Sequence, residues 1–262
     1  MPATKERPFR FVYTGNGDSS TNMAMDESVM IGLRKGTSTP ILRIYKWDPP
    51  TISIGYFQRI SDIDLDKCHN NGIGVVRRLT GGRAVLHHEE LTYSILLTEK
   101  DFTPFKKKEL FLFIAQCLVD SLRILGVHSK IAEKSRGNLH SANCFASPAQ
   151  FEVESRKEGK LIGSAQVIKD GIMLQHGAIP LTGAYSTITK YLTVDAKSFK
   201  SVSSLGEVSN TNVNEEKLLS ALKTGFGKHI DLVDGELSVW EMQKTVELAE
   251  KKYGTKEWLW RK

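Results

Sequence analysis

The chain has 262 residues, of which 40% are hydrophobic and 25% are charged, and its formal net charge is +6 at pH 7. These values fit a globular protein with a large core, and no apolar run approaches the ~20 residues that span a bilayer. The positive charge favours an acidic partner, either a nucleic acid or an acidic protein. Cys68, Cys117 and Cys144 are widely spaced, which fits a reduced cytoplasm and excludes a CxxC zinc site.

The first part of the chain predicts strands separated by one amphipathic helix. The helix is expected to begin at Asn22 as its N-cap and to end before Gly36. Asp26 shares a face with apolar residues of this helix; it lies either close to a site or, as we favour, where an acidic side chain stabilises the helix dipole. Alternating apolar residues predict strands at 9–13, 40–45 and 51–56.

A glycine-containing loop interrupts the next strand-like run. Gly81 and Gly82 have no Cβ, so a ligand can approach the main chain closely there. Arg78 and Arg83 flank the glycines and can offer several donors to phosphate or carbonyl oxygens, and His87 follows them. The alternative is a basic hairpin turn with solvated arginines, because short glycine motifs often match by chance.

The middle of the chain predicts a long helix over 106–125, ended by Gly126, and then a polar loop. Cys117 lies in the apolar stripe of that helix, where a buried thiol is inert, and Cys68 is also interpreted as structural. Cys144 follows a loop of Arg, Gly, Asn, His and Ser, an electropositive setting that can stabilise a thiolate. A lone loop cysteine is nevertheless more often structural.

Two hairpins and a helical tail complete the predicted elements. Residues 151–164 and 167–174 each predict a hairpin, the second with an Asp-Gly turn; without a motif, Lys160 would be an exposed hairpin lysine. An amphipathic helix is expected over 213–226, and a capping box of Ser and Glu begins another at residue 238.

Several segments together resemble one known family. The run RRLTGGRAVLH at 77–87 resembles the signature loop of the lipoate–protein ligase and octanoyltransferase superfamily. Further similar segments are NMAMDE at 22–27, the block from Arg43 to Gln58, GKLIGSA at 159–165 and QHG at 175–177. The run CFASPAQFE at 144–152 resembles the nucleophile motif of the cysteine-dependent octanoyltransferases. The resemblance covers most of the chain.

This resemblance implies roles for individual residues. Cys144 would be the acyl-accepting nucleophile, and Lys160 would hold the acyl carbonyl or adenylate oxygens. The family usually has His-Asp after the glycine loop, whereas His88 follows His87 here and removes a carboxylate near the site. No metal site is expected. The implied substrate-binding residues are Arg78, Gly81, Gly82, Arg83, His87, Gly163, Ser164, Ala165 and His176.

The implied activity is transfer of an octanoyl group from acyl carrier protein, through a Cys144 thioester, to a lysine of a lipoyl-domain protein in lipoate biosynthesis. The acceptor would be a glycine cleavage H protein or a dehydrogenase E2-like protein. No cofactor is expected, because forming an amide from a thioester is downhill. The acceptor lysine is mostly protonated at pH 7, and His87, His176 and Lys160 are the candidates to take its proton.

Two alternative functions also fit the sequence. Lipoate–protein ligases share the glycine loop and the lysine motif but use ATP and Mg to form an acyl-adenylate. Because the chain is too short for the additional domain of large ligases, this alternative is the large domain of a split ligase. The other is a basic module that binds RNA or DNA, which only the net charge supports.

The resemblance also implies the architecture. We expect an α/β fold, that of the biotin/lipoate protein ligase catalytic domain, with a mixed, largely antiparallel sheet in residues 1–205. Residues 206–262 would form a helical extension packed on the same domain. The N-terminal residues lead into no signal-peptide core, so we expect a cytoplasmic monomer that contacts neither membrane nor nucleic acid.

Overall fold

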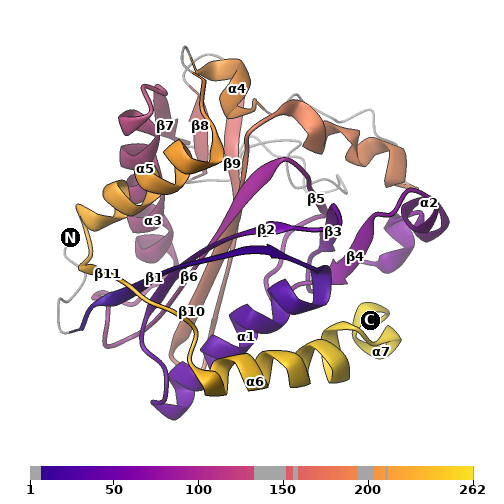
Figure 1. Ribbon diagram of the computed structural model, residues 1–262, viewed down its shortest axis with the longest axis horizontal. Helices are drawn as coiled ribbons and strands as arrows, with labels where there is room; N and C mark the ends of the chain where they lie inside the picture. Colours follow the sequence, from indigo (N-terminus) through magenta and orange to yellow (C-terminus); the bar gives the residue numbers. More distant parts are fainter. Residues whose placement is uncertain (1–6, 133–151, 156–158, 194–202, 210–211, 262) are drawn as a thin grey trace.

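A large sheet lies at the centre of the computed structural model, which describes residues 7–132, 152–155, 159–193, 203–209 and 212–261. Its strands are β1 (Phe9–Gly17), β2 (Ile41–Trp47), β6 (Glu90–Thr98), β7 (Ser129–Ile131), β8 (Val153–Ser155), β9 (Gly159–Lys169), β10 (Ile172–Pro180) and β11 (Leu232–Asp234). In the described residues their order is β11-β1-β2-β6-β10-β9-β8-β7 (Figure 1). Strand β1 is parallel to β2 and β11, and the other neighbours are antiparallel. The predicted mixed, largely antiparallel sheet is confirmed.

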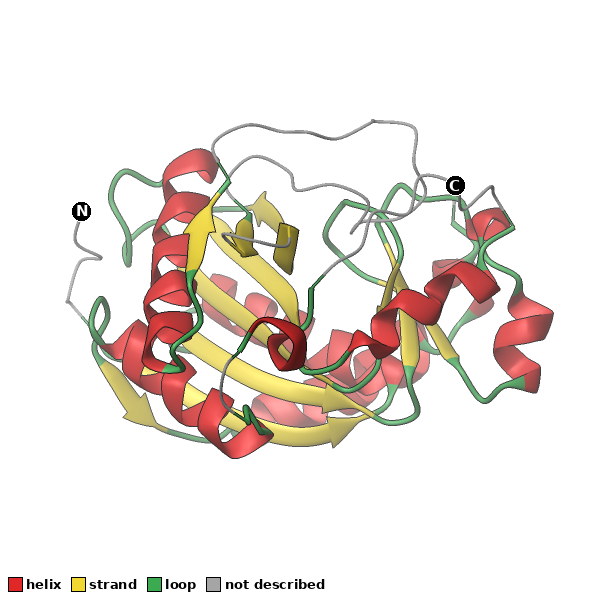
Figure 2. Ribbon diagram, turned by 90° about the horizontal axis from the view of Figure 1, so that it is seen from above, coloured by secondary structure: helices red, strands yellow, loops and turns green. Residues whose placement is uncertain are grey.

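A second, smaller sheet consists of β3 (Thr51–Ile54), β4 (Gly74–Arg77) and β5 (Val85–His87), in the order β4-β3-β5. Figures 1 and 2 show it beside the large sheet. Its apolar side chains pack against α2 (Leu65–Asn70) and η2 (Gly183–Tyr191). The glycine loop connects β4 to β5, so the small sheet fixes both ends of that loop.

Helices cover both faces of the large sheet (Figure 2). On one face, α3 (Lys107–Ile124) and α5 (Glu215–Gly227) bury their apolar stripes against alternate strand residues such as Phe11 and Tyr93. On the other face, α1 (Ser19–Lys35) packs on the intervening residues, among them Val12 and Leu96. The strands are therefore buried on both sides, which explains their nearly continuous apolar character.

Helix α1 begins earlier than the sequence suggested. Its N-cap is Asp18, whose side chain accepts a hydrogen bond from the backbone N–H of Thr21. The predicted cap, Asn22, is instead buried within the helix and donates to the carbonyls of Gly17 and Lys46. The prediction was wrong because Asp18 is itself a good cap. The predicted end is confirmed: Gly36 follows the helix with φ 73°.

The two predicted hairpins share one strand. Strand β9 has 11 residues and pairs with both β8 and β10, so the segments predicted as separate arms are continuous. The Asp-Gly turn between β9 and β10 is confirmed. Asp170 and Gly171 have φ values of 52° and 72°, as a two-residue type I′ turn requires.

The C-terminal segment contacts distant parts of the fold. It contains α4 (Leu205–Val208), α6 (Val239–Leu248), η4 (Ala249–Tyr253) and α7 (Lys256–Leu259). Helix α6 begins at the predicted capping box of Ser238 and Glu241 and lies against α1 (Figure 1). The division at residue 205 stays a prediction. Within the described residues, every helix is too short or too polar to span a membrane.

Candidate active site

A narrow cavity lies where the two sheets meet. Six of the predicted substrate-binding residues line it, whereas Gly81, Gly82, Arg83 and Lys160 do not. Its wall combines apolar side chains with a few polar groups, which suits a ligand with an apolar chain and a polar end. The lining residues are Met23, Tyr45, Trp47, Ser53, Arg78, Val85, His87, Thr92, Gly163, Ser164, Ala165, His176, Gly177 and Ala178.

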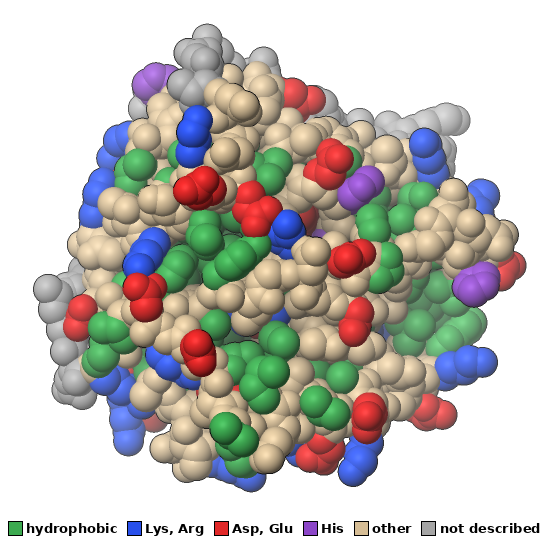
Figure 3. Space-filling model, viewed as in Figure 1, with side chains coloured by type: hydrophobic (Ala, Val, Ile, Leu, Met, Phe, Trp, Pro, Cys, Tyr) green, Lys and Arg blue, Asp and Glu red, His purple; other side chains and the backbone are tan. Residues whose placement is uncertain are grey.

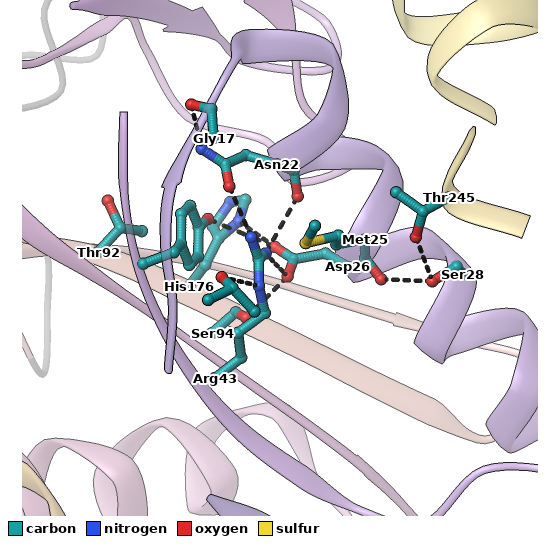
Figure 4. A network of polar contacts seen from close by, with 12 residues as sticks. Gly17, Asn22, Met25, Asp26, Ser28, Arg43, Thr92, Ser94, His176 and Thr245 are labelled. Atoms are coloured by element: carbon teal, nitrogen blue, oxygen red, sulfur yellow. Dashed lines mark hydrogen bonds and ion pairs between the residues drawn. The ribbon is translucent and has the colours of Figure 1, made fainter. Parts of the chain in front are cut away.

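Asp26 organises a buried polar network next to this cavity (Figure 4). Its Oδ1 lies 2.8 Å from Arg43 Nη1 and accepts a hydrogen bond of 2.7 Å from Ser94 Oγ. Burial alone would raise the pKa of Asp26, but Arg43, His176 and Ser94 lower it below its ordinary value. The helix-dipole interpretation was wrong, because Asp26 lies beyond the first turn of α1 and pairs with β2.

His176 connects this network to the glycine loop. Its Nε2 lies 2.6 Å from Thr80 Oγ1, and its Nδ1 lies 3.6 Å from Asp26 Oδ2. Burial lowers the pKa of His176 below its ordinary value, and the neighbouring Asp26 carboxylate offsets this only in part. The imidazole is therefore neutral at neutral pH and ties β10 to both α1 and the loop.

The glycine loop is held by its own arginine. Arg78 is buried and donates hydrogen bonds of 2.8 Å to the carbonyls of Ser53, Gly81 and Arg83. Gly82 has φ 96°, which favours glycine, and its carbonyl passes so close to Gly55 that a Cβ there would lie 1.9 Å from it. The loop backbone is thus fixed by contacts that only these residue types allow.

His87 lies in a second polar group on β5. Its Nε2 is 2.8 Å from Ser53 Oγ, and its Nδ1 is 2.7 Å from Glu90 Oε1. The ring stacks on Trp47 with centroids 4.3 Å apart. Glu90 was not among the residues predicted from the sequence; its position three residues after His87 was the available signal.

Lys160 is buried rather than exposed, so the exposed-lysine alternative was wrong. Its Nζ lies 2.7 Å from Glu152 Oε2, and both side chains are at most 3% exposed. Glu152 is the last residue of the cysteine motif, so the structure joins the two motifs at this ion pair. Cys144 itself lies outside the described residues. Within the described residues, no group of three or more His, Cys, Asp or Glu side chains could hold a metal ion.

The comparisons with known proteins agree with this fold and show the family of the chain. Residues 18–227 match the family model of the lipoyl protein ligase A/B catalytic domain. The octanoyltransferase LipM of Kyrpidia tusciae is 38% identical over 273 residues, covering 97% of this chain and 99% of that protein. The chain belongs to the lipoyl protein ligase A/B catalytic-domain family, as the sequence motifs predicted.

Two solved structures show the same fold. A lipoate-protein ligase A bound with ATP has a TM-score of 0.81 at 27% identity, covering 97% of this chain and 98% of that one. A chain from the structural analysis of the bi-partite lipoate protein ligase of Thermoplasma acidophilum and its E2 lipoyl domain has a TM-score of 0.78 at 26% identity, covering 98% and 99%. The predicted fold class is confirmed.

Proposed function

We propose that this chain is an octanoyltransferase of lipoate biosynthesis, which transfers an octanoyl group to a lysine of a lipoyl-domain protein. The observation that carries this function is the match, over nearly the full length of both chains, to an octanoyltransferase. The largely apolar cavity between the sheets supports it, because its wall suits the tail of an acyl chain. The chain is therefore an acyltransferase enzyme.

The route we propose passes through a thioester on Cys144. The Cys144 thiolate attacks the octanoyl thioester of acyl carrier protein, and an acceptor lysine amine then takes the octanoyl group as an amide. The other two cysteines are poor nucleophiles. Burial raises the pKa of Cys68 to about 11 and raises the pKa of the Cys117 thiol well above its usual range, so both stay protonated at neutral pH.

Lys160 supports the same chemistry through its charge. A buried ammonium paired with Glu152 gives a fixed positive group on β9, three residues before the cavity-lining Gly163. In a site shielded from water, such a charge stabilises the oxyanion that forms when a thioester carbonyl is attacked. We propose this role for Lys160, with neither ATP nor Mg in the reaction.

The proposed partners are octanoyl-acyl carrier protein and a lipoyl-domain acceptor of the H-protein or E2 type. Both are expected to be acidic, which suits the net charge of +6. Nucleic acid is a weaker candidate. On the face drawn in Figure 3, Lys and Arg side chains are interspersed with Asp and Glu rather than gathered in one basic field. A cytoplasmic monomer also remains part of the proposal.

The ligase alternative rests on the structural neighbours, one of which binds ATP and another of which belongs to a bi-partite ligase. In that case the chain would activate free octanoate or lipoate as an adenylate, and Cys144 would have no covalent role. The Cys144 motif and the octanoyltransferase relative favour the transferase.

Intact mass spectrometry tests the proposal. Wild type incubated with octanoyl-acyl carrier protein, without ATP, should gain one octanoyl group that chases onto an added lipoyl domain. Cys144→Ala should form no adduct, whereas Cys68→Ala and Cys117→Ala should form it as wild type does. Modification of the lipoyl domain only when ATP and free octanoate are supplied, with no adduct, would show a ligase instead.

A further inference from the structure

The hydrogen bonds around His87 have a fixed direction. Arg78 Nη1 can only donate, and it lies 3.2 Å from Ser53 Oγ. The Ser53 hydroxyl accepts this hydrogen bond and has its own proton to donate to His87 Nε2, 2.8 Å away. On the other side of the ring, the Glu90 carboxylate accepts from His87 Nδ1 at 2.7 Å. The imidazole thus carries its proton on Nδ1, and its Nε2 accepts a hydrogen bond from the Ser53 hydroxyl at the cavity wall.

The same oxygen of Glu90 accepts a second hydrogen bond, from Thr92. Trp47 Nε1, which is also only a donor, lies 2.8 Å from Thr92 Oγ1, and Thr92 Oγ1 donates to Glu90 Oε1 at 2.5 Å. Glu90 is 5% exposed. A buried carboxylate that orients an imidazole, whose other nitrogen meets a hydroxyl, is the arrangement of a general base.

The same imidazole borders a second space. A surface cleft lies beside the cavity, and Trp47 and His87 line both of them. Glu90 also lines this cleft, and its Oε2 has no hydrogen-bond partner among the described residues. A buried carboxylate oxygen without a partner is costly, and an ammonium group could supply the missing donors. The remaining lining residues are Lys46, His88, Glu89, Leu181 and Glu215.

We propose that the acceptor lysine enters through this cleft and that His87, oriented by Glu90, takes the proton its ammonium must lose. This inference rests on the proposed function, because it concerns the second half of the acyl transfer. It selects one residue from three candidates. His176 does not line the cleft, and Lys160 is held in its ion pair with Glu152.

The lysine ammonium gives a proton to Ser53 Oγ while Ser53 passes its own proton to His87 Nε2. The neutral amine attacks the acyl carbonyl, so a C–N bond forms, the C–S bond of the enzyme thioester breaks, and its electron pair leaves with the sulfur. The second amine proton goes to that sulfur, and His87 returns its proton to solvent.

Two acceptors test this role, because only one of them must lose a proton before it can attack the acyl group. Transfer of octanoyl from the enzyme would be followed to a lipoyl domain, whose lysine must be deprotonated, and to hydroxylamine, whose nitrogen carries no extra proton at neutral pH. For His87→Ala we expect transfer to lysine to fall about 100-fold or more and transfer to hydroxylamine to change little. The exposed His69→Ala is the matched control and should resemble wild type in both.

Two further variants test the same role if His87→Ala folds poorly. Glu90→Gln preserves the shape but removes the charge, and should lower transfer to lysine selectively. Leu181→Trp should narrow the cleft and should therefore also lower transfer to lysine selectively. Equal losses with both acceptors would mean that His87 and Glu90 are only structural, and unchanged transfer to lysine would also overturn the inference.

A wrong proposed function would give a different result from a wrong role for His87. In that case wild type would form no octanoyl-enzyme. The same comparison of lysine with hydroxylamine would then be made with octanoate and ATP as the acyl source, because the acceptor lysine must lose its proton in either reaction. A selective loss in His87→Ala would still support the role of His87, and a uniform loss would reject it.

Discussion

His176 shows how burial can dominate a nearby charge. The Asp26 carboxylate raises the pKa of this imidazole, but burial lowers it more, so the net shift is downward. Below about pH 6.5 this imidazole is therefore protonated in the unfolded chain, whereas in the folded protein it stays neutral to a lower pH. This contribution to stability is complete above that pH and is lost as the pH falls below it.

We predict that the free energy of unfolding of wild type decreases between pH 7 and pH 5 and that His176→Gln reduces this decrease. One fully coupled proton corresponds to at most about 1.4 kcal/mol per pH unit. Urea denaturation at several pH values measures the slope. Asp26, whose lowered pKa acts below about pH 4, does not interfere. The exposed His69→Gln should retain the wild-type slope; the same slope in His176→Gln would contradict the prediction.

For individual residues, the sequence predicted which side chains belong to the site better than it predicted their hydrogen-bond and ion-pair partners. His87, Lys160 and His176 were found because they stand in short motifs, and all three are buried. Their partners depend on the three-dimensional pairing of distant segments: Asp26, for example, is 150 positions before His176. The local preference of an acidic residue for the start of a helix therefore gave the wrong role for Asp26.

Helices α3 and α5 are in close contact at Gly225. A Cβ there would lie 2.6 Å from the backbone N and Cα of Ser121, and nearer still to its hydroxyl. Replacing glycine by alanine within a helix normally stabilises it by about 1 kcal/mol. The backbone of Ser121 cannot move away without shifting α3, and forced packing of this kind costs about 1–3 kcal/mol.

We therefore predict that Gly225→Ala destabilises the protein, by up to about 2 kcal/mol, in spite of the better helix propensity. Gly227, in the same helix, is the matched control, because no atom lies within 4 Å of a Cβ placed there. Gly227→Ala should be neutral or slightly stabilising. Thermal and urea denaturation of both variants give the comparison, and a stabilised Gly225→Ala would show that the helices can separate at little cost.

Whole elements were predicted well where their signal was local. The Asp-Gly turn, the capping box before α6 and the apolar stripe of α3 are all properties of a few neighbouring residues, and all three are confirmed. The assignment of β2 and β3 to different sheets could not be predicted, because it depends on which distant strands pair. The start of α1 was misplaced because two candidates four positions apart, Asp18 and Asn22, are both good caps.

At the scale of the molecule, Arg77 connects the small sheet to the C-terminal segment. Its fully buried guanidinium donates to the carbonyls of Gly55, Tyr56 and Gln58 on one side. On the other side it donates to Leu259 in α7 at 2.7 Å. Trp258 Nε1 in turn donates a hydrogen bond of 2.9 Å to the backbone carbonyl of Arg77. The Arg77 side chain thus connects β4 to a residue more than 180 positions away. Arg77 itself lies directly before the glycine loop.

We predict that Arg77→Met and Arg77→Lys both destabilise the protein by about 3 kcal/mol. Methionine leaves several buried carbonyls without donors, each costing about 1–3 kcal/mol before relaxation, and the single nitrogen of lysine cannot reach both sides of the planar fork. Urea denaturation measures the loss. Trypsin should also cleave after Lys256 sooner, because α7 is released. The exposed Arg59→Met should change stability by less than about 0.5 kcal/mol. If Arg77→Lys were as stable as wild type, the ammonium alone would suffice, and the connection would depend on charge rather than on the geometry of the guanidinium.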